Sequence, residues 1–121
     1  MKLIIAGTRN LDIGIHDIEM LIHRERWVVS EVISGHSGLV DLAGERWAAR
    51  RHIPVKLFPV SSADWERLGK KAGPLRNEEM SYYADALLAI WDGHSRGTKN
   101  MIDLMGERIK PYIVVTKEVV S

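Results

Sequence analysis

Short, continuous apolar runs alternate with amphipathic segments along most of the chain. Such runs, bounded by glycine or polar residues, are typical of strands that are buried in a parallel sheet. Apolar residues that recur every three or four positions are typical of helices that cover a sheet. The first such segment carries Ile15, Ile18, Leu21 and Ile22 on one side. The alternation predicts an α/β domain.

The same pattern predicts where the elements lie. Helices are expected after a cap at Asp12, from Val40, from Pro74 as the first helical residue, and over 97–109. The polar segment SSADWERLGKKAG (61–73) is typical of a long loop or of a broken helix. We predict one domain over residues 1–121, with helices on both faces of a mainly parallel five-stranded sheet. The expected strands are KLIIAG (2–7), EVIS (31–34), VKLFPV (55–60), ALLAIW (86–91) and YIVV (112–115).

Composition restricts the class of protein further. Hydrophobic residues make up 45% and charged residues 27% of the 121 residues, as in soluble globular domains. The absence of cysteine excludes disulfides and thiolate metal sites. The initial apolar run, Leu3 to Ala6, is shorter than the roughly 7–15 residues of a signal peptide. No run approaches the ~20 apolar residues of a membrane span, so we expect a cytoplasmic protein.

A net charge of +1 provides no general attraction for nucleic acid or an anionic membrane, so anion binding would need a local cluster. In a parallel sheet the carboxyl ends of all strands meet at one edge, where ligands bind. Arg9, Arg96 and Lys99 should therefore reach one rim, with Arg76 close by. Open glycine N–H groups and helix N-termini there favour phosphate. The polar segments that follow strands are 7–10, 34–38, 59–64 and 92–99.

Each of these features also has an ordinary structural explanation. Gly7-Thr8 before a helix is typical of capping, exposed arginines are usually solvated, and Asp92 can simply begin a turn with Gly93. The loop GHSRGTK is not a Walker loop, because its lysine follows the threonine, and no GxGxxG sequence is present. The five histidines lack the spacing of HExxH or HxH metal sites. We therefore expect no cofactor and no metal ion.

Two further features, a pair of carboxylates and a tryptophan, could contribute to a functional site. Asp41 and Glu45 are four residues apart on a predicted helix, hence on one face, where two carboxylates can perform acid–base chemistry. They can equally form a solvated face with Arg46 or Arg50. Among the four tryptophans, Trp65 is the candidate for a lid that stacks on a base.

Four segments, IIAGTRN, ISG…VDLAGERWA, AGPLRNEEM and DALLAIWDGHSRGTKNMIDL, resemble the YspA-like family of the SLOG superfamily. That superfamily includes the LOG phosphoribohydrolases and the single-strand-binding DprA proteins. The likeness covers nearly the whole chain and implies a Rossmann-like sheet with a nucleotide-derived ligand at the rim. The resemblance matches thirteen candidate site residues, and we add His36 and Lys99 from the rim loops to them. The matched residues are Gly7, Thr8, Arg9, Ser34, Gly35, Asp41, Arg76, Asn77, Asp92, Ser95, Arg96, Gly97 and Thr98.

The chain departs from this family pattern at two places. The family usually has S-G-G-x-x-G-x-D after the second strand, whereas this chain has SGHSGLVD, with His36 and Leu39 in place of glycines. The His36 side chain should either fill space near the ligand or contact the ligand. The LOG enzymes carry a glutamate three residues after the Gly-Thr threonine, and here that position is Met101. Methionine cannot act as an acid or base.

Two functions follow. In the first, a nucleotide or nucleotide-derived small molecule is sensed or sequestered, with ribose hydroxyls bound by Asp41 or Asp92. In the alternative, an N-glycosidase or phosphoribohydrolase uses Asp41, Glu45 or Glu78 to stabilise an oxocarbenium-like transition state or to activate water. The apolar Met101 favours binding. The low net charge disfavours nucleic acid as a partner, no membrane partner is expected, and an uncovered apolar helix face would favour a homo-oligomer.

Overall fold

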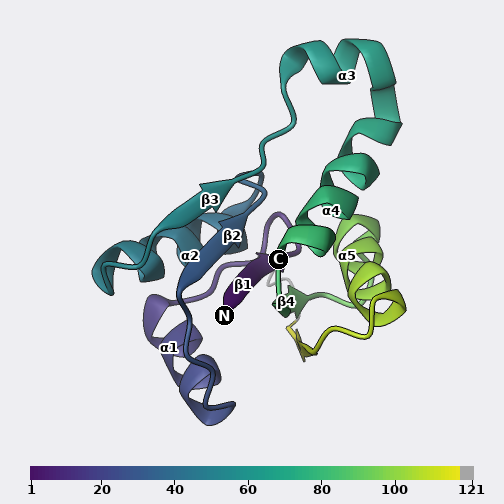
Figure 1. Ribbon diagram of the computed structural model, residues 1–121. Helices are drawn as coiled ribbons and strands as arrows, with labels where there is room; N and C mark the ends of the chain where they lie inside the picture. Colours follow the sequence, from purple (N-terminus) through teal and green to yellow (C-terminus); the bar gives the residue numbers. More distant parts are fainter. Residues whose placement is uncertain (118–121) are drawn as a thin grey trace.

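The computed structural model describes residues 1–117, which form a five-stranded parallel sheet with helices on both faces (Figure 1). The strand order is β3-β2-β1-β4-β5, and every neighbouring pair is parallel. The strands are β1 (Lys2–Gly7), β2 (Glu31–Ser34), β3 (Val55–Leu57), β4 (Ala86–Trp91) and β5 (Tyr112–Thr116). The helices are α1 (Ile15–Arg24), α2 (Leu39–Arg50), α3 (Ser62–Leu68), the 3-10 helix η1 (Gly69–Lys71), α4 (Ala72–Tyr83) and α5 (Arg96–Glu107).

Two apolar cores lie on opposite faces of the sheet, because successive side chains of a strand point to opposite faces. Leu3 and Ile5 of β1 pack with Trp47 of α2 in the core beneath α1 and α2. Ile4, the residue between them, packs with Met80 of α4 in the core beneath α4 and α5. The predicted α/β/α sandwich is confirmed. None of the helices within residues 1–117 is long and apolar enough to cross a membrane.

Several predicted boundaries were wrong. The cap of α1 is Gly14 instead of Asp12, because the buried Leu11 and Ile13 first hold the chain extended against the core. Pro74 is the third residue of α4, not the first. Strand β3 ends at residue 57, three residues early, and the nearby Pro59 has no N–H with which to extend the ladder. Helix α5 covers 96–107, where 97–109 was expected.

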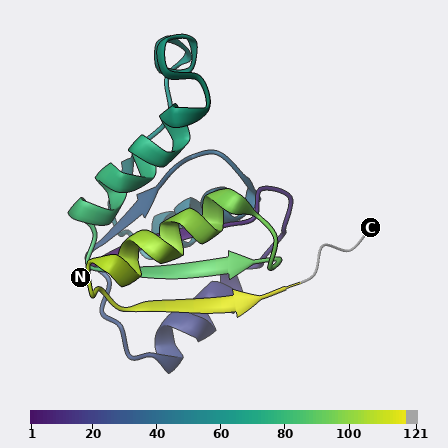
Figure 2. The same cartoon turned by 90° about the vertical axis from the view of Figure 1, so that its right-hand side faces the viewer.

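The 61–73 segment is a broken helix, one of its two predicted forms. Ser61 caps α3, its Oγ accepting a hydrogen bond from Asp64 N at 3.1 Å. Gly69 has a φ of 57°, which ends α3 before η1 and α4 begin. Helix α3 and η1 form an arm that projects beyond the carboxyl edge of the sheet (Figures 1 and 2). The arm adds side chains above that edge.

Strands β1 and β4 are central neighbours, with Gly7 opposite Ile90 in their register. From β1 the chain continues through α1 to β2 on one side, whereas from β4 it continues through α5 to β5 on the other. The loops that leave the two strands therefore diverge and leave a crevice at their carboxyl ends. Such a reversal of strand order is the usual place for a ligand in an open parallel sheet.

Helix α2 approaches β1 closely at Gly44. A Cβ at this position would lie 2.8 Å from Ile5 Cβ and 2.9 Å from its Cγ2. The Gly44→Ala variant should lose about 1 kcal/mol of unfolding free energy, because overpacking costs more than alanine gains in a helix. Denaturant titration measures this change. The control is Gly106→Ala in α5, where a Cβ would meet only Tyr112 at 3.8 Å and should stabilise the protein by about 0.5–1 kcal/mol. Equal stabilisation of both variants would contradict the close approach.

Candidate functional site

A cavity of about 270 Å³ lies at the carboxyl edge of the sheet, and we call it the rim cavity. It lies at the ends of β1 and β2, between the N-terminal part of α2 and the helices α4 and α5. Nine of the residues that the sequence predicted for a site line it, and they come from four separate segments of the chain. These are Gly7, Arg9, Gly35, Asp41, Arg76, Asn77, Ser95, Gly97 and Thr98.

Arg76 of α4 is fixed in the wall of the rim cavity by backbone carbonyls. Its Nη1 donates to Gly35 O at 2.9 Å and to Phe58 O at 3.0 Å, the carbonyls just beyond β2 and β3. Its Nε donates to Asn77 Oδ1 at 3.1 Å. The guanidinium lies so close to the chain that a Cβ at Gly35 would be 2.8 Å from Nη1. Glycine at this position therefore permits the contact.

The rim cavity carries a concentration of positive charge. Burial lowers the pKa of Arg76, Asp41 opposes this shift, and the nearby charge of Arg9 adds to the lowering. Arg9 is exposed, and its side chain has no hydrogen-bond or ion-pair partner within residues 1–117. Because two cations that are close together repel each other, an anion between them would be stabilised by both. Their arrangement suits a phosphate or a carboxylate.

Asp41 is the one carboxylate among the residues that line the rim cavity within the described chain. It is buried, and its Oδ2 accepts hydrogen bonds from Ser37 N at 2.9 Å and from Ser37 Oγ at 3.0 Å. Burial raises the pKa of Asp41, whereas the bonds from Ser37 and the charge of Arg76 lower it. The carboxyl group can accept a hydrogen bond from a ligand hydroxyl or hold a proton.

The floor of the rim cavity joins α4 to α5. Asn77 Nδ2 donates to Asn100 Oδ1 at 3.0 Å and to Gly97 O at 3.3 Å. Met80 and Met101 are buried beside it and line the cavity. Sequence reasoning missed Met80 as a lining residue, although it lies three and four residues after Asn77 and Arg76, on the same side of a helix. Met101, three residues after Thr98, thus presents an apolar side chain to the cavity.

Three predicted site residues build the loops around the rim cavity instead of lining it. The Oγ1 of Thr8 accepts a hydrogen bond from Asp92 N at 3.0 Å, which joins the ends of β1 and β4. Asp92 Oδ1 accepts from His94 N and Ser95 N, both at 2.8 Å, and these two bonds lower its pKa. Ser34 donates from Oγ to Glu45 Oε2 at 2.7 Å. Asp92 therefore acts as a turn residue, because its carboxylate accepts the backbone N–H groups of the two residues that follow Gly93.

Four other candidates lie outside the rim cavity. Arg96 and Lys99 are exposed at the start of α5, and Lys99 Nζ pairs with Asp103 Oδ2 at 2.9 Å. Glu45 is engaged by Ser34 at the end of β2 and by the His36 ring in the loop that follows. Glu78 lines a different pocket, on the outer side of α4. The structure therefore separates the cations at the helix start from those in the cavity.

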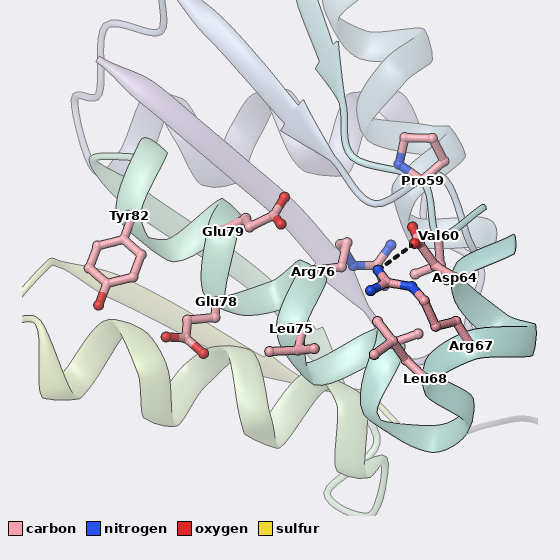
Figure 3. Close-up of a pocket in the computed structure, with 11 residues that line it drawn as sticks. Pro59, Val60, Asp64, Arg67, Leu68, Leu75, Arg76, Glu78, Glu79 and Tyr82 are labelled. Atoms are coloured by element: carbon pink, nitrogen blue, oxygen red, sulfur yellow. Dashed lines mark hydrogen bonds and ion pairs between the residues drawn. The ribbon is translucent and has the colours of Figure 1, made fainter.

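That outer pocket, of about 370 Å³, lies between α3 and α4 (Figure 3). Asp64, Glu78 and Glu79 line it, and Asp64 pairs with Arg67 at 3.4 Å. Arg67, Arg76 and apolar side chains such as Leu75 complete the lining (Figure 3). Its three carboxylates outnumber its two arginines, and Arg67 already pairs with Asp64, so this pocket suits phosphate less well than the rim cavity does. The rim cavity is the better candidate site.

His36 occupies a position that favours glycine. Its φ is 53°, in the left-handed region that glycine adopts without strain. Its Nδ1 lies 2.9 Å from Glu45 Oε2, so the ring turns toward α2 and not into the rim cavity. The hydrogen bond and the charge of Glu45 raise the pKa of His36. The side chain lines two other cavities that adjoin the rim cavity.

Comparison with known proteins finds a relative of this chain in a bacteriophage. An 82-residue stretch is 42% identical to the "Gene 61 protein" of Mycobacterium phage D29. The match spans 65% of this chain and 65% of that protein, which is less than two-thirds of its length. No protein-family model and no solved structure matches the chain.

The His36–Glu45 pair predicts a pH-dependent stability. A histidine whose pKa is raised on folding stabilises the protein fully below its ordinary pKa, 6.5, and the stabilisation is lost as pH rises through the raised value. We expect the unfolding free energy of the protein to exceed that of His36→Asn most at about pH 6, with the difference shrinking by about pH 8.5. Asparagine tolerates the positive φ. Urea titrations at both pH values measure the difference, and a constant difference would contradict the pairing.

Proposed function

We propose that this protein binds a nucleotide or nucleotide-derived small molecule at the rim cavity, as a sensor or a sequestering module. The observation that supports the proposal is that Arg9 and Arg76 line one cavity at the carboxyl edge, where the charge of Arg9 acts on the guanidinium of Arg76. Arg76 uses Nε and Nη1 within the protein, so its Nη2 and the guanidinium of Arg9 are the donors left for phosphate oxygens. Arg76 is already held by two carbonyls, so little side-chain entropy is lost when it binds.

The remaining lining suits a sugar beside the phosphate. Asp41, Asn77 and Thr98 provide polar groups of the kind that bond ribose hydroxyls. The volume of about 270 Å³ is slightly below the ~300–1,000 Å³ typical of ligand pockets. A ribose phosphate is therefore the part of a nucleotide that best fits the rim cavity.

The resemblance to the SLOG superfamily supports the same proposal. Its expected nucleotide site and the rim cavity share Gly7, Arg9, Gly35, Arg76 and Gly97. We place the chain with the YspA-like proteins of that superfamily on this basis. The side chain that would correspond to the LOG glutamate is an apolar one, which favours binding without hydrolysis.

Hydrolysis of an N-glycosidic bond is the second candidate, and Asp41 is the observation that favours it. The carboxyl group lines the rim cavity, and burial raises its pKa, as suits a general acid. Chromatography of nucleoside monophosphates after incubation with the protein would reveal free base. If base is released, Asp41→Asn should reduce the rate by about 100-fold or more, the usual contribution of a general acid. If no base is released while binding is detected, the binding function stands alone.

Removal of Arg9 tests phosphate binding without disturbing the fold, because its side chain is exposed. Arg9→Ala should weaken binding of ribose 5-phosphate and of inorganic phosphate by about 1.5–3 kcal/mol, which is about 10- to 150-fold in Kd. Isothermal titration calorimetry measures the affinity, and thermal unfolding checks that the variant is folded.

The matched control is Arg46→Ala, which removes the same charge from an exposed position on α2 outside the rim cavity. This variant should bind both probes as the wild-type protein does. Equal weakening of the two variants would attribute the effect to net charge, and unchanged affinity of Arg9→Ala would remove Arg9 from the site.

A further inference from the structure

A second cavity, of about 360 Å³, adjoins the rim cavity, and we call it the arm cavity. The two cavities share the wall formed by Arg9, Gly35, Ser37 and Arg76. Beyond that wall the arm cavity extends to Trp65 on the projecting arm. A ligand anchored by the two arginines can therefore reach from one cavity into the other.

The charge of the arm cavity also suits a phosphate-bearing ligand. Lys70 and His36 join the two arginines in its lining, and no Asp or Glu among the described residues lines it. The pairing with Glu45 raises the pKa of His36 and also offsets its charge, so Lys70 is the cation that the arm adds. An anion at the shared wall would therefore be attracted from both sides.

Trp65 is the one aromatic residue among the described residues that line either cavity. Its side chain is 51% exposed, and its indole N–H has no partner within residues 1–117. The capped helix α3 holds it above the carboxyl edge. Exposed aromatic rings beside a cationic groove are the platforms on which nucleobases stack. The rim cavity offers no comparable flat surface.

We propose that a bound nucleoside phosphate extends across both cavities and stacks its base on Trp65. The phosphate lies at the shared wall, between Arg9 and Arg76, and the ribose lies toward the polar groups of the rim cavity. This inference rests on the proposed function, which requires only the phosphate and sugar contacts. It adds that Trp65 distinguishes a nucleotide from a plain sugar phosphate. Because every base has a stacking face, the contribution is similar for different bases, and larger for purines.

The test compares probes with and without a base on the full-length protein. AMP, GMP, CMP and UMP are titrated beside ribose 5-phosphate into wild type, Trp65→Ala and Trp65→Phe. Stacking predicts that Trp65→Ala weakens AMP binding by about 5- to 150-fold and leaves ribose 5-phosphate unchanged. Trp65→Phe keeps a ring and should retain part of the AMP affinity.

A matched control is Tyr82→Ala, which removes an exposed aromatic ring on the outer side of α4, outside both cavities. It should bind every probe as the wild type does. Circular dichroism checks that each variant is folded.

The outcomes separate the two proposals. If AMP and ribose 5-phosphate bind equally well and Trp65→Ala affects neither, stacking is overturned while the phosphate site stands. Stacking is also overturned if Trp65→Ala weakens both probes to the same extent, since the effect then does not involve the base. If none of the probes binds wild type, the proposed function itself fails.

Discussion

The guanidinium group of Arg76 holds the carboxyl edge of the sheet together. It bonds the carbonyls of Gly35 and Phe58, which follow β2 and β3, and the side chain of Asn77. Asn77 in turn bonds Gly97 O at the start of α5. A partly buried cation is stable only when such acceptors surround it, because removing it from water is costly. The positions of α4 and α5 relative to the sheet, and hence the rim cavity, depend on this network.

The same network leaves positive charge at the site only partly compensated. Arg9 lies near enough to Arg76 to lower its pKa, and the partly compensating carboxylate, Asp41, is itself buried. Groups with perturbed pKa values gather at functional sites, where a bound ligand can neutralise charge that the protein's own side chains leave unpaired. An anion that enters between the guanidinium groups would neutralise their positive charge. The arm adds two more side chains to this surface. Lys70 adds positive charge, and Trp65 adds an aromatic ring.

The loop after β2 holds a histidine at a backbone position that favours glycine. His36 adopts the left-handed conformation that glycine favours, and its ring bonds Glu45 on α2. That bond offsets part of the conformational strain, which is of order 1–3 kcal/mol for a residue that is not glycine. It also directs the ring away from the rim cavity. The histidine therefore leaves the rim cavity open and places a titratable side chain beside it.

Much of the architecture was predictable from the sequence, because periodicity is a local property. Runs such as 2–7 and 86–91 identified parallel strands, and parallel strands necessarily bring their polar carboxyl ends to one edge. The boundaries were less predictable, since Gly14 replaced Asp12 as a cap only because Leu11 and Ile13 are buried first. The local sequence does not show that packing, because it involves residues that are distant in the chain.

What the sequence by itself determined is the class of fold and the set of loops that surround the site. Only the tertiary structure decided which cations face the cavity. Thr98 and Met101 pack inward on α5, so the helix turns Lys99 outward to Asp103 and leaves Arg96 exposed. Arg76, by contrast, is drawn inward by carbonyls from two other strand ends. The rotation of a helix about its axis is set by contacts with segments distant in the chain, which no local pattern contains.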